Sequence, residues 1–197
     1  MKLFINDSSP YSRVVRIVAI EKGLAESVTL EWCNPWAEQS TVLEINPANR
    51  IPVLVTDDGI PISESILIAQ HFDTLTHDKP LLRLDDRETL RVVGLGLGLM
   101  EAAFTSVIAG KYEGKAAGDS FLGKRRTEAI SKTLQTLDTV MSTRSVVVSL
   151  GEVVVGVALS YLKYRMPLND WENRYAELLK LYERLSQRDS FQQTPFK

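Results

Sequence analysis

The sequence predicts two domains of different class: a small α/β domain over residues 1–76 and an all-helical domain over residues 84–197. Short apolar segments with strand character are confined to the first part, where they alternate with helical stretches. Residues 77–83 contain Pro80 and charged side chains, which is typical of a linker. Beyond this linker the strand signals fade, and long helical stretches continue to about Leu185.

The first part shows the order βαβ followed by a ββα unit. A helix is expected from Ser9, which can cap it and is followed by Pro10, to Lys22, where Gly23 provides a stop. A short helical piece is expected near 38–45, and a further helix over 64–75. The tight turn 57–59 separates the last two of four expected strands, at residues 2–5, 28–32, 52–56 and 60–63.

The second part is expected to contain helices over 87–113, 120–141, 146–161 and 171–186, with an irregular tail after them. Two runs of three valines make the third of these segments resemble a strand. A capping box favours a helix instead, because Ser149 can cap the N–H of Glu152 while Glu152 reaches back to Ser149. Val148 and Val153 then occupy the two positions of a hydrophobic staple.

Composition limits the classes of function. The chain has 197 residues, 44% of them hydrophobic and 24% charged, which is ordinary for a soluble globular protein. The net charge of -2 gives no electrostatic case for a nucleic acid or an anionic membrane as partner. No apolar run approaches the ~20 residues of a membrane span, and the first residues do not resemble a signal peptide. A single cysteine, Cys33, fits a reducing, cytoplasmic location, and the two histidines, His71 and His77, are too few for most metal sites.

The step from the first strand to the first helix reads Ser9-Pro10-Tyr11-Ser12. In a thioredoxin-like fold this step carries a Cys-x-x-Cys pair, and glutaredoxins often have Cys-Pro-Tyr-Cys. Hydroxyls replace both sulfurs here, so dithiol exchange is not possible at this site. A helix start favours an anion, and Ser9 could donate a hydrogen bond to a thiolate supplied by a ligand. The alternative is that Ser9 is only a helix cap.

Two further signals follow. A proline at the start of an interior strand cannot donate to the ladder, and a cis peptide at Ile51-Pro52 would expose the backbone of Val53. The alternative is an ordinary proline between a loop and an edge strand. Glu64 and Ser65 open a helix whose start could bind a carboxylate while Glu64 binds an ammonium group, although a plain helix cap explains them as well.

With these three signals in this order, the chain resembles the cytosolic glutathione transferase superfamily, particularly its small bacterial members. The resemblance implies a thioredoxin-like domain followed by a helical acceptor domain, and it extends to the capping box at Ser149. It implies that Ser9, with Ser8 as the second candidate, contacts the sulfur of glutathione. It further implies that Arg50 and the Ile51-Pro52-Val53 segment bind the glycyl and cysteinyl parts, and that Glu64 and Ser65 hold the γ-glutamyl head.

The segment Gly94-Leu95-Gly96-Leu97-Gly98 resembles part of a dinucleotide-binding loop, but the fingerprint needs a glycine where Leu99 stands. We therefore expect these glycines in a helix, where Gly94 and Gly98 share a face that another backbone could approach. The resemblance implies that this helix lines the acceptor pocket and lies near a subunit interface. Candidate lining residues are Leu97, Met100, Phe104 and Tyr112, with ordinary core packing as the alternative for each.

The expected function is that of a glutathione transferase that activates the glutathione thiolate for attack on a small hydrophobic electrophile. The resemblance implies a homodimer with glutathione as co-substrate and no tightly bound cofactor or metal. Two alternatives stay open. The chain could be a non-catalytic binding or regulatory protein on the same scaffold, such as relatives that bind RNA polymerase or sequester apolar ligands. It could instead perform glutathione-dependent peroxidase or isomerase chemistry.

Overall fold

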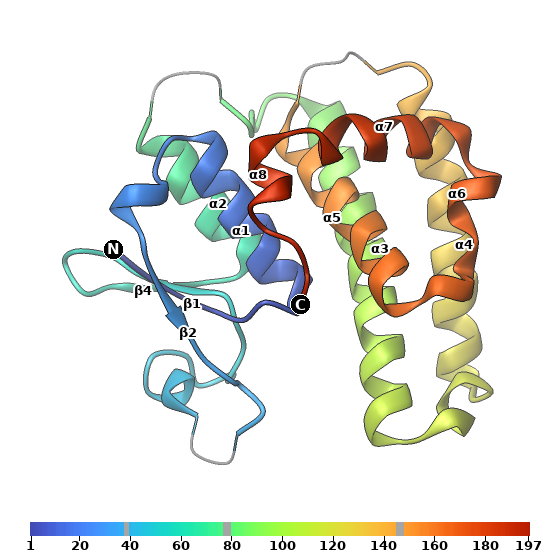
Figure 1. Cartoon of the computed structure of the whole chain (residues 1–197), viewed down its shortest axis with the longest axis horizontal. Helices are drawn as coiled ribbons and strands as arrows, with labels where there is room; N and C mark the ends of the chain where they lie inside the picture. The colour runs from blue at the N-terminus through green and yellow to red at the C-terminus, as the bar shows by residue number, and fades with distance from the viewer. Residues whose placement is uncertain (38–39, 77–79, 145–147) are drawn as a thin grey trace. The chain divides into compact units, whose positions relative to one another are not determined.

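The computed structural model describes all residues except 38–39, 77–79 and 145–147, and it divides the chain into two compact units (Figure 1). The first unit comprises Met1–Leu81 together with Asp189–Lys197, and the second comprises Leu82–Arg188. The division between Leu81 and Leu82 falls within residues 77–83, the segment expected as a linker. The C-terminal tail differs from the expectation, since it groups with the first unit and not with the helical one.

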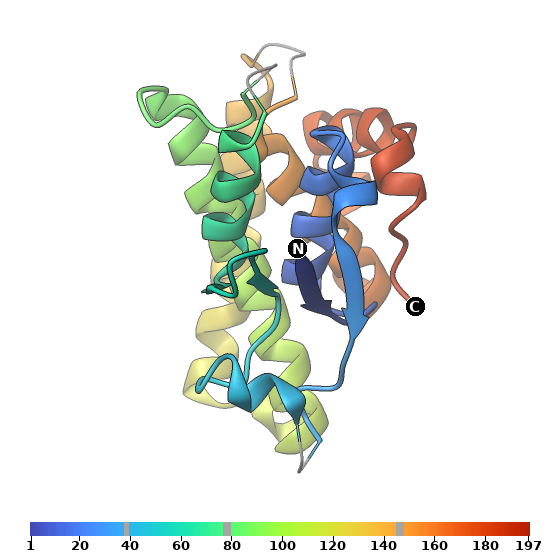
Figure 2. The same cartoon turned by 90° about the vertical axis from the view of Figure 1, so that its left-hand side faces the viewer.

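The first unit is built on a four-stranded sheet of β1 (Lys2–Ile5), β2 (Thr29–Trp32), β3 (Val53–Val55) and β4 (Pro61–Ser63) in the order β2-β1-β3-β4. β1 runs parallel to β2, beside which it lies in Figure 2, and antiparallel to β3. β3 and β4 form the predicted hairpin. All four expected strands are therefore present, each within a few residues of its predicted bounds.

Helices α1 (Pro10–Glu21) and α2 (Ser65–Thr74) contribute the apolar partners of the sheet. Side chains alternate along β1, so that Leu3 and Ile5 are fully buried while Lys2 is exposed. They share the core of the unit with fully buried apolar residues of the two helices, among them Val14, Ile17, Ile68 and Phe72. Short 3-10 turns occupy Ala25–Ser27 and Thr41–Glu44, the second of which replaces the helical piece expected near 38–45. This arrangement is the predicted thioredoxin-like fold.

The C-terminal tail is joined to α1 through a buried arginine. Arg13 is 8% exposed, and its guanidinium lies 4.7 Å from the ring centre of Phe196 and 5.4 Å from that of Phe191. It also donates to the carbonyl of Phe191 at 3.3 Å. The tail is not wholly irregular as expected, because it forms the short helix α8 (Asp189–Gln192), which lies beside α1 in Figure 1.

The second unit contains the helices α3 (Arg87–Tyr112), α4 (Phe121–Met141), α5 (Leu150–Arg165), α6 (Trp171–Arg174) and α7 (Ala176–Ser186), with 3-10 turns at Lys115–Gly118 and Pro167–Asn169. α5 is its central helix, since every residue over 150–162 is buried. The helix expected from residue 146 begins at Leu150, and residues 146–147 lie outside the described residues. The valines over 153–155 are helical, as the capping box predicts: Gly151 N–H donates to Ser149 Oγ at 3.2 Å, and Ser149 N–H donates to Glu152 Oε2 at 2.9 Å. The all-helical class of this unit is confirmed.

The prediction of one continuous helix over 171–186 is wrong, because the helix is interrupted at Tyr175. This residue is extended, with φ −130° and ψ 90°, and a new helix begins after it. Asp138 of α4 supplies the cap of that helix, since its Oδ1 accepts from the N–H groups of Glu177 at 2.9 Å and Leu178 at 3.1 Å. The capping group therefore comes from a distant part of the chain.

Gly94, Gly96 and Gly98 lie in a helix, as predicted. The prediction that Gly94 and Gly98 form the face approached by another backbone is wrong. Gly96 makes the close approach, because a Cβ there would lie 2.9 Å from Val154 Cγ1 and 3.2 Å from Val155 N of α5. Gly94 and Gly98 are exposed, with no atom within 4 Å of an added Cβ. The two outer glycines thus face away from α5.

α3 is more apolar than expected from a sequence in which no apolar run approaches ~20 residues. Within the described residues it is the one helix that is long and apolar enough to cross a membrane by length and composition. However, 44% of its most apolar window is buried inside the protein, and the helix packs along α5 and α4. These contacts are those of a core helix in a bundle.

Candidate functional site

The strand register brings the three predicted segments to one end of the sheet. Phe4, near the end of β1, pairs with Val53, the first residue of β3. Val53 in turn pairs with Ser63, the last residue of β4. The loop to Ser9, the Pro52 bend and the start of α2 therefore leave the sheet side by side, although they are far apart in the sequence.

Ser9 is the N-cap of α1, as predicted, and is half-buried. Its Oγ accepts a hydrogen bond from the backbone N–H of Ser12 at 3.2 Å, and its own N–H donates to Asn6 Oδ1 at 2.7 Å. The first bond uses a lone pair of the Ser9 oxygen and leaves its O–H proton available for donation. Ser8 is also half-buried, one residue before the cap. Both candidate hydroxyls therefore lie at the helix start, where an anion is favoured.

The second hydroxyl of the Ser-Pro-Tyr-Ser frame lies inside the unit. Ser12 is fully buried, and its Oγ has no hydrogen-bond partner among the described residues. A buried hydroxyl without a partner costs about 1–3 kcal/mol. Ser9 is thus the accessible member of the pair and Ser12 the inaccessible one.

The peptide bond between Ile51 and Pro52 is cis, as predicted. Pro52 and Val53 are buried, whereas Arg50 is exposed at the entrance to the bend. Asn46 braces the loop from inside: its Nδ2 donates to the Arg50 carbonyl at 2.9 Å, and its Oδ1 accepts from Ala48 N–H at 3.1 Å. The loop therefore has a defined shape, with a cationic side chain at its outer side.

Glu64 has a backbone φ of +71°, which is strained for a residue with a side chain. It is exposed at the N-cap position of α2 and makes no capping hydrogen bond with its side chain. Ser65, the first residue of α2, is only 3% exposed. The strained backbone places an exposed carboxylate at a helix start, an arrangement suited to a ligand that carries both an ammonium and a carboxylate group.

Cys33 follows β2 at the same end of the sheet. Its N–H donates to the Ile5 carbonyl at 2.9 Å, and its thiol donates to the same oxygen at 3.5 Å. Burial raises the pKa of the Cys33 thiol, an effect larger than the opposite one of its hydrogen bond to Ile5. The thiol is therefore protonated at neutral pH and is a poor nucleophile.

The candidate acceptor residues of α3 differ in accessibility. Met100 is fully buried, Leu97 and Phe104 are half-buried, and Tyr112 is 55% exposed. Three of the four are thus at least partly exposed to solvent. No group of three or more potential metal ligands occurs in the part of the chain that the structure describes. His71 lies in the last turn of α2, and His77 lies outside the described residues.

Two asparagines that shape the loop before Pro52, Asn46 and Asn49, are not among the site residues predicted from the sequence. Asn49 has a positive φ of 50°, and its Nδ2 donates to the Pro35 carbonyl at 2.8 Å. The pattern Asn-Pro-x-Asn before a second proline was a usable signal, because asparagine is favoured in turns and in left-handed backbone.

Comparison with known proteins agrees with this geometry. A family model for the N-terminal domain of glutathione S-transferases matches residues 8–75. The uncharacterized GST-like protein YibF of Escherichia coli (strain K12) is 30% identical over 203 residues, covering 98% of this chain and 98% of its own. The chain belongs to the glutathione S-transferase superfamily. The matched N-terminal segment contains all the predicted thiol and glutathione residues.

Solved structures of glutathione transferases extend the similarity to both units. A glutathione S-transferase from Methylobacillus flagellatus with glutathione bound is 28% identical, with a TM-score of 0.92 over 100% of this chain and 99% of that one. Another from Methylobacterium radiotolerans, in complex with glutathione sulfonate, is 30% identical, with a TM-score of 0.89 over 100% and 95%. The superfamily architecture is thus present throughout the chain.

Proposed function

We propose that this glutathione S-transferase family member is a transferase that activates glutathione through Ser9 and adds it to a small hydrophobic electrophile. The observation that carries the proposal is the strand register. It places Ser9, the cis-Pro52 bend and Glu64–Ser65 at one end of the sheet. Binding of glutathione or glutathione sulfonate by structural relatives supports the same assignment.

Each end of glutathione has a chemical counterpart in this site. The γ-glutamyl head carries an ammonium and a carboxylate, which suit the exposed Glu64 carboxylate and the helix start at Ser65. The backbone of Val53 offers N–H and C=O groups to the cysteinyl part, and the exposed Arg50 offers a cation to the glycyl carboxylate. The Ser9 hydroxyl then donates to the sulfur.

The energetics of thiol activation match what this site offers. A thiol with a pKa of ~8.5 is about 3% thiolate at pH 7, and lowering that pKa by ~2 units requires about 2.7 kcal/mol. A hydrogen bond to the charged sulfur contributes roughly 1.5–3 kcal/mol, and a helix N-terminus adds ~0.3–1 kcal/mol. The required ~2.7 kcal/mol therefore lies within the range of about 1.8–4 kcal/mol that Ser9 and the start of α1 contribute together. Ionisation alone accelerates the reaction at most ~30-fold, so further acceleration has to come from positioning the electrophile.

In the proposed reaction the thiolate forms a sulfur–carbon bond with the electrophile. With an aryl chloride, the carbon–chlorine bond breaks and chloride leaves with the electron pair. The proton released from the thiol passes to solvent.

We propose that Leu97, Phe104 and Tyr112 contribute to the acceptor pocket, and that the protein acts as a cytoplasmic homodimer without a bound metal or cofactor.

The decisive experiment compares Ser9→Ala with Ser8→Ala in conjugation of glutathione to a chlorodinitrobenzene. We expect Ser9→Ala to return the pKa of the bound glutathione thiol toward ~8.5 and to lower the rate at neutral pH by up to ~30-fold. Ser8→Ala, at the second candidate hydroxyl, should retain both values, and a loss in Ser8→Ala alone would assign the sulfur contact to Ser8. Full activity of Ser9→Ala would remove Ser9 from its role. Absence of glutathione binding at millimolar concentration in calorimetry would contradict the proposal and favour a non-catalytic binding protein.

A further inference from the structure

A single side chain joins the loop that follows β2 to the loop that precedes β3. The Nδ2 of Asn49 donates to the carbonyl oxygen of Pro35 at 2.8 Å, across 14 residues of sequence. The Oδ1 of Asn49 is buried and has no partner among the described residues. The orientation of this side-chain amide therefore depends on the one bond to Pro35.

The backbone of Asn49 is as unusual as its side chain. Its φ of +50° lies in the left-handed region, which asparagine, aspartate and glycine adopt at low cost. Its N–H donates to the Asn46 carbonyl at 2.8 Å and closes the turn. Glycine would satisfy this backbone requirement without the bond to Pro35. The presence of asparagine therefore adds a connection that the turn itself does not need.

The Pro35 side of this connection is fixed to the sheet. Cys33 N–H donates to the Ile5 carbonyl at 2.9 Å and continues the pairing of β2 with β1. Asn34 then closes the turn, since its Oδ1 accepts from Trp36 N–H at 3.1 Å and its carbonyl accepts from Ala37 N–H at 3.2 Å. Pro35 thus lies in a hydrogen-bonded turn that directly follows the sheet.

The other side of the connection leads directly into the segment proposed to bind glutathione. Arg50 follows Asn49, and its carbonyl is held by the Nδ2 of Asn46 at 2.9 Å. Asn46 is 8% exposed, so this brace is shielded from water. The cis bond and Val53 come next. Movement of Asn49 therefore changes the position of Arg50 and of the backbone before Val53.

We propose that Asn49 is a positioning residue that clamps the two loops together and presets the Arg50–Val53 backbone for glutathione. This inference rests on the proposed function and adds to it a residue that need not touch the ligand. A preset loop gives tighter binding because the ligand does not have to order it. Loss of one neutral hydrogen bond corresponds to about a 2- to 10-fold weaker affinity.

The test uses two variants that keep the left-handed backbone and remove the bond. Asn49→Asp retains the size of the side chain but has no N–H to donate at neutral pH. Asn49→Gly removes the side chain and adds no charge. Because only one variant changes the charge, a common effect of both cannot be electrostatic. The control is Asn173→Asp in the helical unit, which makes the same chemical change at another asparagine amide donor.

We expect both Asn49 variants to raise the dissociation constant of glutathione in calorimetry by about 2- to 10-fold. The KM for glutathione should rise equally, whereas kcat and the pKa of the bound thiol stay unchanged because Ser9 is untouched. Amide hydrogen exchange of Trp36 and Ala37 should become faster in the ligand-free variants. Asn173→Asp should leave all these values at the wild-type level.

The outcomes separate this proposal from the proposed function. If the wild type binds glutathione and both Asn49 variants bind it equally well, the clamp is refuted and the transferase proposal is unaffected. A lower melting temperature without a change in dissociation constant would mean that Asn49 is only structural, and this result also refutes the clamp. If the wild type binds no glutathione, the proposed function fails, and the role of Asn49 toward this ligand fails with it.

Discussion

Replacement of Glu152 by glutamine tests whether the carboxylate that completes the α5 capping box also stabilises the helical unit through its charge. Glu152 is 1% exposed, and its Oε2 accepts from the backbone N–H and the hydroxyl of Ser149. Its Oε1 accepts from Arg144 Nε at 2.8 Å, and Arg144 Nη2 continues to Thr89 Oγ1 at 3.3 Å. The carboxylate therefore ties the start of α5 to the segment after α4 and to α3.

The expected loss of unfolding free energy depends on which of these hydrogen bonds the glutamine side-chain amide can keep. Glutamine can still accept from Ser149, but its NH₂ group faces Arg144 in place of an oxygen. Breaking a fully buried ion pair costs about 3–5 kcal/mol, and a single charged hydrogen bond is worth about 1.5–3 kcal/mol. Because the Arg144 side chain is 16% exposed and keeps Thr89, we expect a loss of about 2–3 kcal/mol of unfolding free energy for Glu152→Gln.

The assay has to report on the helical unit, because a chain with two units need not unfold in one step. Trp171 is 2% exposed in that unit, whereas Trp32 and Trp36 are more than half exposed in the other. Urea unfolding followed by Trp171 fluorescence, with the other two tryptophans replaced by phenylalanine, isolates the transition.

The matched control for this substitution is Glu172→Gln, which breaks the exposed 2.7 Å pair with Lys163. We expect it to cost less than about 1 kcal/mol. A Glu152→Gln variant no less stable than the Glu172→Gln control would refute this stabilising role of the Glu152 charge. In a double-mutant cycle, Arg144→Met should cost less when Glu152 is glutamine than in the wild type, since the ion pair is already lost and only the bond to Thr89 remains.

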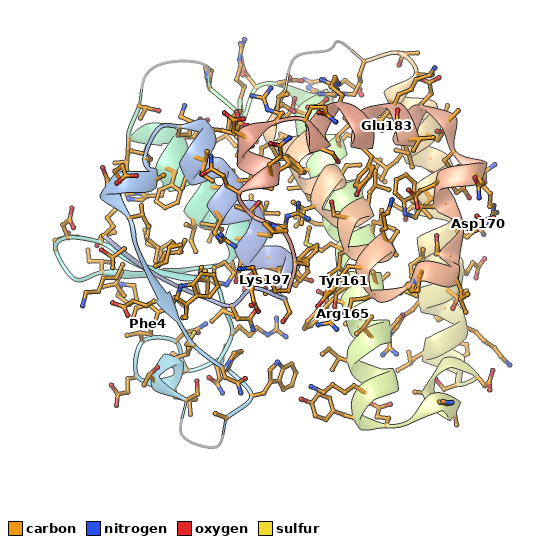
Figure 3. All side chains as sticks on the ribbon, viewed as in Figure 1. Phe4, Tyr161, Arg165, Asp170, Glu183 and Lys197 are labelled. Carbon is orange, nitrogen blue, oxygen red and sulfur yellow. The ribbon has the colours of Figure 1, made fainter. Side chains whose placement is uncertain are left out.

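Two further predictions concern packing and titration. Gly96→Ala should lose about 1–3 kcal/mol in the same urea assay, because its Cβ would lie 2.9 Å from Val154 Cγ1. The matched Gly98→Ala should gain about 0.5–1 kcal/mol, and destabilisation there would show that another surface covers that face. Burial raises the pKa of Tyr161 to about 12, although Arg165, beside it in Figure 3, acts in the opposite direction. The folded pKa exceeds the unfolded value of ~10, so this contribution to stability is complete below pH ~10 and is lost as the pH rises toward 12. A difference titration of phenolate absorbance against Tyr161→Phe measures it, and ionisation near pH ~10 would contradict the burial argument.

The features that the sequence predicted correctly depend on neighbouring residues. Ser9 before Pro10 marks the start of α1, and Ser149 with Glu152 marks the start of α5, because the capping partners lie within one helical turn. The cis bond at Pro52 follows from the proline at a strand start.

The features that were missed depend on residues far away in the sequence. The break at Tyr175 is stabilised by Asp138, which no local pattern around 171–186 reveals. The choice of Gly96 over Gly94 and Gly98 depends on which face of α3 meets α5. Because α3 carries apolar residues on most sides, its periodicity does not identify the contact face. Attachment of the tail likewise depends on Arg13, a charged residue that is buried through its contacts with Phe191 and Phe196.

The two hydroxyls of the Ser-Pro-Tyr-Ser segment determine whether a reactive sulfur at the start of α1 belongs to the protein or to a ligand. A cysteine at position 9 would itself become the anion that the start of α1 stabilises. Serine leaves this position uncharged, so the helix start can stabilise a sulfur anion that belongs to a ligand. Neither Ser12, which is buried, nor Cys33, whose thiol pKa is raised by burial, can take over as a nucleophile there. None of these side chains therefore competes with a sulfur supplied by a ligand, and the proposed ligand, glutathione, supplies one.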